Sequence, residues 1–538
     1  MTENQNLGTI DALGRPIPSP LAPKTARNNK YVGIFYFVWL GEHGRHKPYD
    51  ITKISRADPD AGYRTESDIW GGIGTYHHWG EPFFGYYYSD DEWVVRRHMR
   101  LLCESGVDFL YFDTTNALIY EKNVKLVMTV LEEYHNAGIA IPKVMFYTNT
   151  ASGATVESIY QTIYKPGFCP DTWFTYEGKP VIIAKPEECS PETANFFNIK
   201  LAQWPNEPDK EGGWPWMDFV RPQRAFNNLN GTPECINVSV AQHPQLRFGD
   251  SVLYGEEGNR GRSYHDGAND KSPDAFLYGH NLREQFDRAV EADVPVTLVT
   301  GWNEWIAGRW QGIPERPIMF VDCADNEYSR DIEMMRGGYF DNYYMQLCDY
   351  TARLKGKPEP ETHTPGETAE YLGFPDGDFP RCHEGYGTTY VNRTQRNAIT
   401  RVTVSHTADT VTFTIETKEP IDTTDTSGTF LSVFLQTEGN AGHNFILNHA
   451  FSGDSTTLAA VDDTYQATEE TTLPVGTEEN RLTVSCPLRL LGIDGHAFEI
   501  RFKVCDSRVR ITAAEDFYDK GDCLPTGRLD FIYRGNVL

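Results

Sequence analysis

The sequence predicts a (β/α)8 barrel followed by an antiparallel β-sandwich, in a chain of 538 residues that is too long for one ordinary domain. From about residue 31 to 357, short β-branched apolar runs alternate with helix-like stretches, as in a parallel sheet. Beyond about residue 370, apolar and polar residues alternate between turns, as in an antiparallel sheet. The predicted domains are the barrel with its N-terminal extension (1–357), a linker rich in Pro, Thr and Glu (358–370) and the sandwich (371–538).

Eight apolar runs are expected to form the strands of the barrel. They are residues 31–39, 107–113, 143–148, 180–184, 199–204, 217–221, 236–242 and 296–302. Helices are expected at 90–106, 121–138 and 279–293, where apolar residues recur every three or four positions. An open doubly wound sheet, the alternative, would need a glycine-rich phosphate loop after the first strand, and none follows it.

The charged and aromatic segment 325–347 is predicted as the closing helix of the barrel, with Asp331 and Arg336 in structural roles. Its position after the eighth predicted strand is the place where a last helix packs across the barrel.

Composition excludes two classes of partner. The net charge of −27 repels nucleic acid and anionic membrane surfaces. The sequence has no run of 18 apolar residues, so it predicts no membrane span.

The first residues lack the pattern of a secretory signal, so a cytoplasmic protein is expected unless an export signal has been trimmed. Ten scattered cysteines without a CxxC pair favour free thiols, and neither a metal nor another cofactor is expected.

The stretch VTLVTGWNEW (296–305) ends an apolar strand on a carboxylate between two indoles. Catalytic groups of parallel barrels lie at the carboxyl ends of the strands, so Glu304 is expected at the barrel mouth. Trp302 and Trp305 beside it would raise the pKa of its carboxyl and allow a general acid, with Asn303 in contact with substrate. The alternative is a surface ion pair between Glu304 and Arg309, four residues on.

TGWNEW (300–305) resembles the terminal-strand motif of glycoside hydrolase family 99 endo-α-mannosidases and their relatives, which include family 71-like enzymes and barrel proteins assigned to lipopolysaccharide biosynthesis. Residues 77–117 are similar to the segment that enters the second strand in that group, and YEGKPVII (176–183) is similar to its Gly-Lys-Pro strand. The likeness covers roughly residues 30–345 and implies a glycosidase with a carbohydrate substrate. The C-terminal domain resembles carbohydrate-binding modules. Between binding sugar and bracing the barrel, the second role is favoured for it.

The sequence departs from the family motif at one position. The family continues Trp-Asn-Glu-Trp-His-Glu-Gly, whereas this chain reads WNEWIAG, so that Ala307 stands where the second glutamate would be. Glu304 matches the first glutamate, which the resemblance implies acts on the sugar 2-hydroxyl. A partner carboxylate for Glu304 must therefore come from elsewhere in the chain. The alternatives to a glycosidase are a glycosyltransferase-like enzyme and a non-catalytic carbohydrate-binding protein.

Candidates for the partner lie in two places. Asp113 ends the second predicted strand, although an Asp before Thr-Thr-Asn also suits a helix cap. Glu256 and Glu257 lie in the glycine-flanked loop 254–267, in which Arg260 and Arg262 would hold the substrate by forked hydrogen bonds. The alternative for this loop is a solvated surface with local ion pairs.

Further substrate contacts are expected from strand ends, where a sugar-stacking role competes with ordinary core packing. Histidines at a barrel mouth bind hydroxyls or move protons, and aromatic rings stack on sugars. The candidates are His77, His78, His243, Tyr36, Trp39 and Tyr147.

Overall fold

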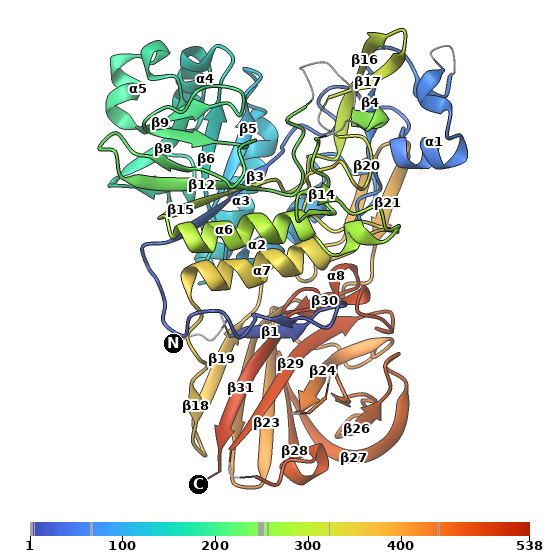
Figure 1. Cartoon of the computed structure of the whole chain (residues 1–538). Coiled ribbons are helices and arrows are strands. Elements are labelled where there is room, and N and C mark those ends of the chain that lie inside the picture. The colour runs from blue at the N-terminus through green and yellow to red at the C-terminus, as the bar shows by residue number, and fades with distance from the viewer. Residues whose placement is uncertain are drawn as a thin grey trace.

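A computed structural model describes residues 4, 6–64, 68–245, 252–255, 258–321, 323–437, 439–440, 442–495 and 497–537. The chain forms a nearly closed barrel and, beneath it in Figure 1, a large antiparallel sheet. Among the described residues, no helix has the length and apolar character needed to cross a bilayer.

Eight parallel strands make up the barrel in the part of the chain that the structure describes. Their order is β10 (Gly213–Pro215), β9 (Asn198–Gln203), β8 (Lys179–Ala184), β6 (Lys143–Thr148), β5 (Phe109–Thr114), β3 (Tyr31–Tyr36), β15 (Val296–Thr300) and β12 (Pro233–Ser239). An antiparallel strand, β11 (Ala225–Asn227), borders β12, and β10 also contacts β12. The parallel sheet therefore nearly meets itself, in a strand order that follows the chain.

Helices cover the outside of this sheet. They are α2 (Glu92–Ser105), α3 (Glu121–Asn136), α4 (Ser152–Ile159), α5 (Pro191–Phe196), α6 (His280–Ala292) and α7 (Asn342–Lys355). The three helices expected from the sequence are confirmed as α2, α3 and α6. Gly106 ends α2 with a φ of 74°, a left-handed conformation that favours glycine.

Three expectations for the barrel need correction. The predicted sixth strand at 217–221 is wrong, because β10 at Gly213–Pro215 takes that place. The connections that follow β9 and β10 carry no helix among their described residues, so a regular eightfold β/α repeat is not formed. Of the predicted closing helix at 325–347, only the end is helical; residues 323–341 run irregularly before α7 begins.

Burial explains why these runs form a parallel sheet. Every residue of β5 and β15 is buried, as is expected of strands covered on both faces. A close approach fixes Gly33 in β3, because a Cβ atom there would lie 2.1 Å from the ring of Phe109 on the neighbouring strand. Phe109 stacks on Phe174 at 4.0 Å and fills the interior at this end of the barrel.

The second sheet contains the alternating strands that the sequence predicts. In β22 (Ile399–His406), β23 (Thr410–Thr417) and β28 (Arg481–Pro487), buried residues alternate with less buried ones. Phe413 of β23 lies 5.3 Å from Phe502 of β29 (Ala497–Ser507), although these strands are not neighbours in the sheet. The sheet therefore folds over on itself around an apolar core, as in a sandwich.

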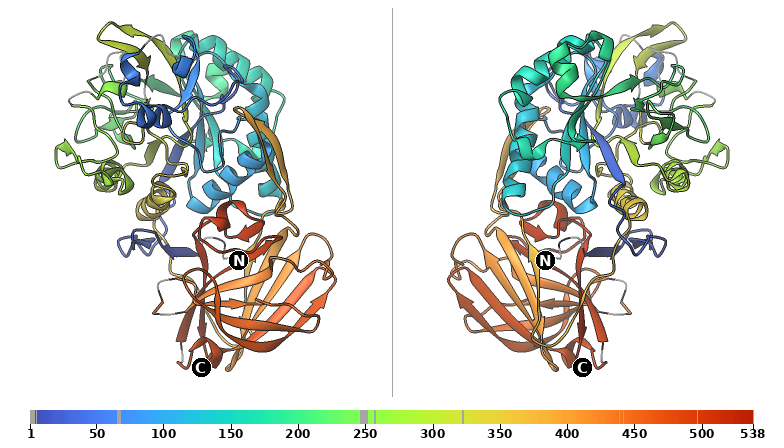
Figure 2. Two further views of the ribbon diagram at one scale, coloured as in Figure 1. Left: turned by 90° about the vertical axis from the view of Figure 1, so that its right-hand side faces the viewer. Right: turned by 90° about the vertical axis from the view of Figure 1, so that its left-hand side faces the viewer.

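Segments far apart in the sequence hold the two parts together. The N-terminal strand β1 (Leu7–Ile10) pairs with β31 (Asp530–Asn536), and it crosses the top of the second sheet in Figure 1. The hairpin of β20 (Arg381–Gly385) and β21 (Thr388–Asn392) extends in the other direction, along the side of the barrel (Figure 2). Two strands, β18 (Thr362–His363) and β19 (Thr368–Leu372), form within or across the predicted linker.

Candidate active site

A cavity of about 640 Å³ opens at the carboxyl ends of the barrel strands. Its wall combines carboxylates, a guanidinium, an imidazole and aromatic rings from at least six strand ends. The residues are Phe35, Phe37, Asp113, Thr115, Trp204, Pro205, Asn206, Glu207, Trp216, Met217, Phe219, His243, Pro244, Glu304, Val321 and Arg330. This end of a parallel barrel is where catalytic residues converge in enzymes of this architecture.

Glu304 follows β15 and reaches the cavity wall, with 14% of its side chain exposed. Arg330 donates a hydrogen bond from Nη2 to Glu304 Oε2 at 2.6 Å, and its guanidinium lies 5.2 Å from the ring of Trp216. The backbone N–H of Glu304 donates to the Asp331 carboxylate behind it. Glu304 is thus fixed at both its backbone and its side chain, and its ion pair is with Arg330, whereas the alternative reading of the sequence expected Arg309.

Asp113 ends β5 and faces the same cavity. Its Oδ1 accepts hydrogen bonds from the backbone N–H and the hydroxyl of Thr115, at 3.1 and 2.8 Å. Its Oδ2 accepts from the indole Nε1 of Trp39 at 3.0 Å. Trp39 therefore positions a cavity carboxylate, a role different from the sugar platform expected of it.

A third carboxylate, Glu207, lies in the loop after β9. It accepts from Lys210 Nζ at 2.7 Å and from the backbone N–H of Trp204 at 3.1 Å. Partial burial alone would raise the pKa of Glu207, but these donors outweigh it and lower the pKa below its usual value. Trp204 packs edge-on against Trp216 at 5.3 Å, so two half-buried indoles form an apolar wall beside the acids.

The residues on either side of Glu304 point away from the cavity. Trp302 and Trp305 are fully buried, and Trp305 stacks on Trp79 at 4.4 Å. Asn303 bonds both the N–H and the carbonyl of Phe37, at 2.9 and 3.0 Å, and so clamps the end of β3. The expected indole walls and amide contact with substrate are corrected to structural roles, because the chain turns back here into β16 (Ile306–Ile313).

Four further candidates also lie in packed surroundings. Tyr36 donates to or accepts from His98 Nδ1 at 3.0 Å, and the Tyr147 hydroxyl donates to Gln203 O at 3.1 Å, both within the core. His77 and His78 belong to the strand β4 (Tyr76–His78), which pairs with β16. Burial lowers the pKa of His77 to about 4 and that of His78 well below its usual value. None of these four lines the described cavity.

The predicted binding loop contributes differently from expectation. Arg262 is fully buried between the rings of Tyr339 and Tyr343, and donates to Asp331 O at 2.8 Å. Arg260 donates to Phe219 O at 2.9 Å, so both arginines fasten the loop to the barrel. Glu256 and Glu257 lie outside the described residues.

His243 is the remaining candidate, and the structure places it in the cavity wall with Asp113 and Glu304. The position of the missing family glutamate, Ala307, lies in β16 opposite His77 and is not among the described lining residues.

The residues missed from the sequence come from irregular segments. Arg330 belongs to the stretch predicted as a helix, and Trp204, Glu207 and Trp216 lie in the two connections, after β9 and after β10, that carry no helix among the described residues. The one available signal was the cluster of tryptophans and charges between 204 and 216, which no strand or helix pattern accounts for.

No protein-family model matches the chain, and a comparison with curated proteins gives no match. Among solved structures, the chain is similar to the GH99 endo-α-mannosidase from Bacteroides thetaiotaomicron, with 14% identity over 60% of this chain and 96% of that one and a TM-score of 0.36. A second structure of a GH99 endo-α-mannosidase from this bacterium, in complex with bis-tris-propane, gives 16% identity over 60% and 95% and a TM-score of 0.34. The endo-β-1,4-mannanase from Thermotoga petrophila gives 8% identity over 82% and 95% and a TM-score of 0.19. Similarity at this level does not carry function, which has to come from the residues of the site.

Proposed function

We propose that this chain is a glycoside hydrolase with a catalytic barrel of the (β/α)8 type, and that Glu304 and Asp113 are its two catalytic carboxylates. The observation that carries the proposal is the presence of both side chains, from separate strand ends, in one aromatic-walled cavity of about 640 Å³. Glycoside hydrolysis generally uses two carboxylates, and indole faces bind sugar rings.

Their surroundings suit different roles. Glu304 is paired with the guanidinium of Arg330, and a nearby cation favours a charged carboxylate. We therefore assign Glu304 the role of base or nucleophile. Asp113 is the second carboxylate of the cavity and is positioned by hydrogen bonds from Trp39 and Thr115, and we assign it the transfer of a proton to the leaving oxygen.

The aromatic wall supplies the second half of the proposal. Trp204 and Trp216 offer half-buried apolar faces, while Asp113, Glu304, Arg330 and His243 offer hydrogen-bonding groups to hydroxyls. A pocket with apolar faces and few polar groups is typical of a site for a small neutral ligand such as a sugar unit.

The test is hydrolysis of a panel of aryl α- and β-glycosides and natural oligosaccharides by wild type, Glu304→Gln and Asp113→Asn. Each substitution is expected to lower kcat at least about 100-fold, equivalent to about 2.7 kcal/mol of transition-state stabilisation. Glu121→Gln, on the exposed face of α3, serves as the matched control and should retain the wild-type rate. NMR of the first product anomer then separates retention from inversion.

Two outcomes count against the proposal. If wild type cleaves a substrate and Glu304→Gln keeps its rate, the chemistry lies elsewhere in the barrel. If calorimetry shows that wild type binds glycans but no member of the panel is cleaved, the cavity is that of a carbohydrate-binding protein.

A further inference from the structure

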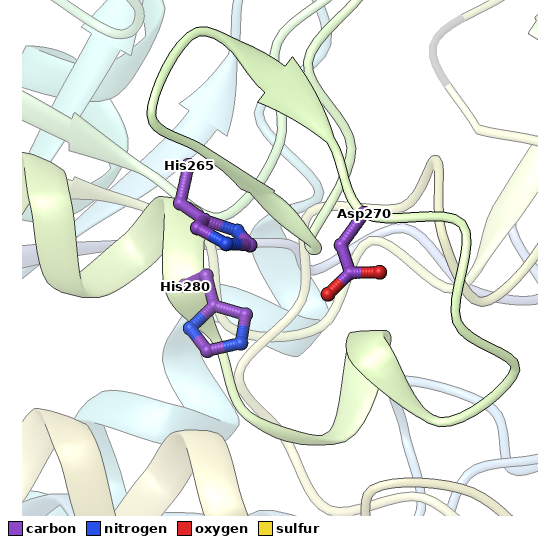
Figure 3. Close-up of side chains that lie close together, drawn as sticks. All are labelled: His265, Asp270 and His280. Carbon is purple, nitrogen blue, oxygen red and sulfur yellow. The ribbon is translucent and has the colours of Figure 1, made fainter.

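Two histidines and an aspartate converge outside the cavity, and the proposed hydrolysis does not use them. His265 lies in β13 (Tyr264–His265), Asp270 directly follows β14 (Ala268–Asn269), and His280 is the first residue of α6. One potential ligand atom from each residue lies within 4.8 Å of the other two, and all three side chains are partly exposed. Figure 3 shows the Asp270 carboxylate facing the two imidazoles.

We propose that His265, Asp270 and His280 bind a divalent transition-metal ion such as Zn²⁺, which joins the hairpin of β13 and β14 to the start of α6. Two imidazoles and one carboxylate are a donor set that suits zinc and its neighbours in the transition series better than Mg²⁺ or Ca²⁺. Ligand atoms of a tetrahedral site lie about 3.3 Å apart, given bonds of about 2.0–2.1 Å. The potential ligand atoms, which lie within 4.8 Å of one another, would have to move closer together on binding.

Contacts around two of the ligands favour metal binding. His265 Nδ1 lies 2.9 Å from the carbonyl oxygen of Ser263, which only accepts, so Nδ1 carries the proton and Nε2 keeps its lone pair. Such an outer hydrogen bond is the usual way in which proteins orient a metal-binding histidine. Asp270 Oδ1 accepts from the backbone N–H of Ser272 at 2.8 Å, which fixes the carboxylate and leaves Oδ2 directed elsewhere.

The two imidazoles lie side by side, with their ring centroids 4.4 Å apart, so one ion between them can be reached by both. A neutral imidazole and an ionised carboxylate are the forms that bind metals.

Neighbouring arginines oppose the ion, and Arg283 contacts one of the ligands directly. Arg283 Nη2 donates to His280 Nδ1 at 3.2 Å, so its guanidinium occupies a lone pair and brings a positive charge to the site. Arg283 is exposed and free to swing into solvent, but at a cost to the affinity. Removal of this charge is therefore expected to strengthen binding, an effect opposite to that of removing a ligand.

The test is titration of chelator-treated, tag-free full-length protein with Zn²⁺ by calorimetry, with the d–d absorption of Co²⁺ as a second probe. Wild type is expected to bind one ion, His265→Ala and Asp270→Asn at least about tenfold more weakly, and Arg283→Met about fivefold more tightly. His135→Ala is the matched control, because His135 faces Asp171 at 4.0 Å and, within the part of the chain that the structure describes, the two belong to no group of three potential ligands.

The result that would overturn the site is equal Zn²⁺ affinity in wild type, His265→Ala and Asp270→Asn, or no saturable binding to wild type below about 100 µM. His280→Gln provides a second ligand variant should His265→Ala disturb the hairpin, and circular dichroism establishes that each variant is folded. Glycoside hydrolysis plays no part in these measurements, so the metal site stands or falls independently of the proposed function.

Discussion

Asp376 is a buried charge at the boundary between the barrel and the second sheet, and its replacement by asparagine makes a quantitative test. It lies between β19 and β20, and accepts from Arg100 Nε at 2.9 Å, Arg96 Nη1 at 3.1 Å and the Tyr134 hydroxyl at 2.5 Å. Arg100 also donates to Asp522 at 2.7 Å. Helices α2 and α3 of the barrel are thus bonded to the C-terminal part through one carboxylate.

The expected effect follows from the charges. Burial alone would raise the pKa of Asp376, but Arg100 and Arg96 outweigh it and lower the pKa from 3.8 to about 2. This difference corresponds to about 2.5 kcal/mol in favour of the folded state. Because the pKa is lowered on folding, the stabilisation is present above about pH 4 and is lost as the pH falls towards 2.

Asp376→Asn removes this stabilisation and leaves the guanidinium groups of Arg96 and Arg100 with one fewer anionic partner. Breaking a buried ion pair in this way costs about 3–5 kcal/mol. We expect equilibrium urea denaturation, followed by tryptophan fluorescence at pH 7, to show a loss of that size. The difference between wild type and variant should shrink below about pH 4, where the carboxylate of the unfolded wild type takes up a proton while that of the folded protein stays charged down to about pH 2.

Asp378→Asn is the matched control two residues on. Asp378 pairs with Lys418 at 3.2 Å, with both side chains more than a third exposed, so its loss should cost less than about 0.5 kcal/mol. The conclusion that buried charges stabilise this boundary would be refuted by either of two results. One is a loss of less than about 1 kcal/mol in the free energy of unfolding of Asp376→Asn, and the other is a difference from wild type that does not change with pH.

Three further substitutions test other parts of the structure. Trp39→Phe keeps an aromatic ring but removes the donor to Asp113 Oδ2, and is expected to lower kcat about tenfold and shift the pH–rate profile, an effect on the profile that the loss of buried volume alone would not cause. Trp216→Ala removes an apolar face of the cavity and should weaken glycan binding by about 1–2 kcal/mol in calorimetric titration, while a sugar-independent structural role would leave the affinity unchanged. Burial raises the pKa of Glu104, which accepts from the Thr526 N–H at 2.8 Å, to about 8. Wild type should therefore lose stability relative to Glu104→Gln as the pH rises from about 5 to 8, and parallel denaturation curves across this range would contradict the shift.

Much of the barrel could be predicted because its strands and helices carry local patterns. The runs at 107–113 and 143–148 are mostly apolar and rich in aromatic residues, and α2 ends at a glycine. The prediction of a strand at 217–221 was wrong. The strand at this place, β10, has only three residues and pairs with β9, and no recognisable apolar run marks it in the sequence.

By itself, the sequence indicated that Glu304, Asp113 and His243 are candidates for one site, because each lies at or after the end of a strand and the carboxyl ends of parallel strands meet at one edge. It left the partner of Glu304 open between Asp113 and the pair Glu256 and Glu257. It did not determine which side chains beside them face inward. Trp302 and Trp305 turn into the core as the chain reverses into β16.

Only the tertiary structure decided the partners of the site. Arg330 reaches Glu304 from an irregular segment 26 residues later, and Trp39 reaches Asp113 from the segment that follows β3. The same holds for His265, Asp270 and His280, whose spacing matches no linear metal motif. The physical reason is common to all of them: side-chain contacts between distant segments depend on how loops return to the sheet, and loop paths leave no periodic signal in the chain.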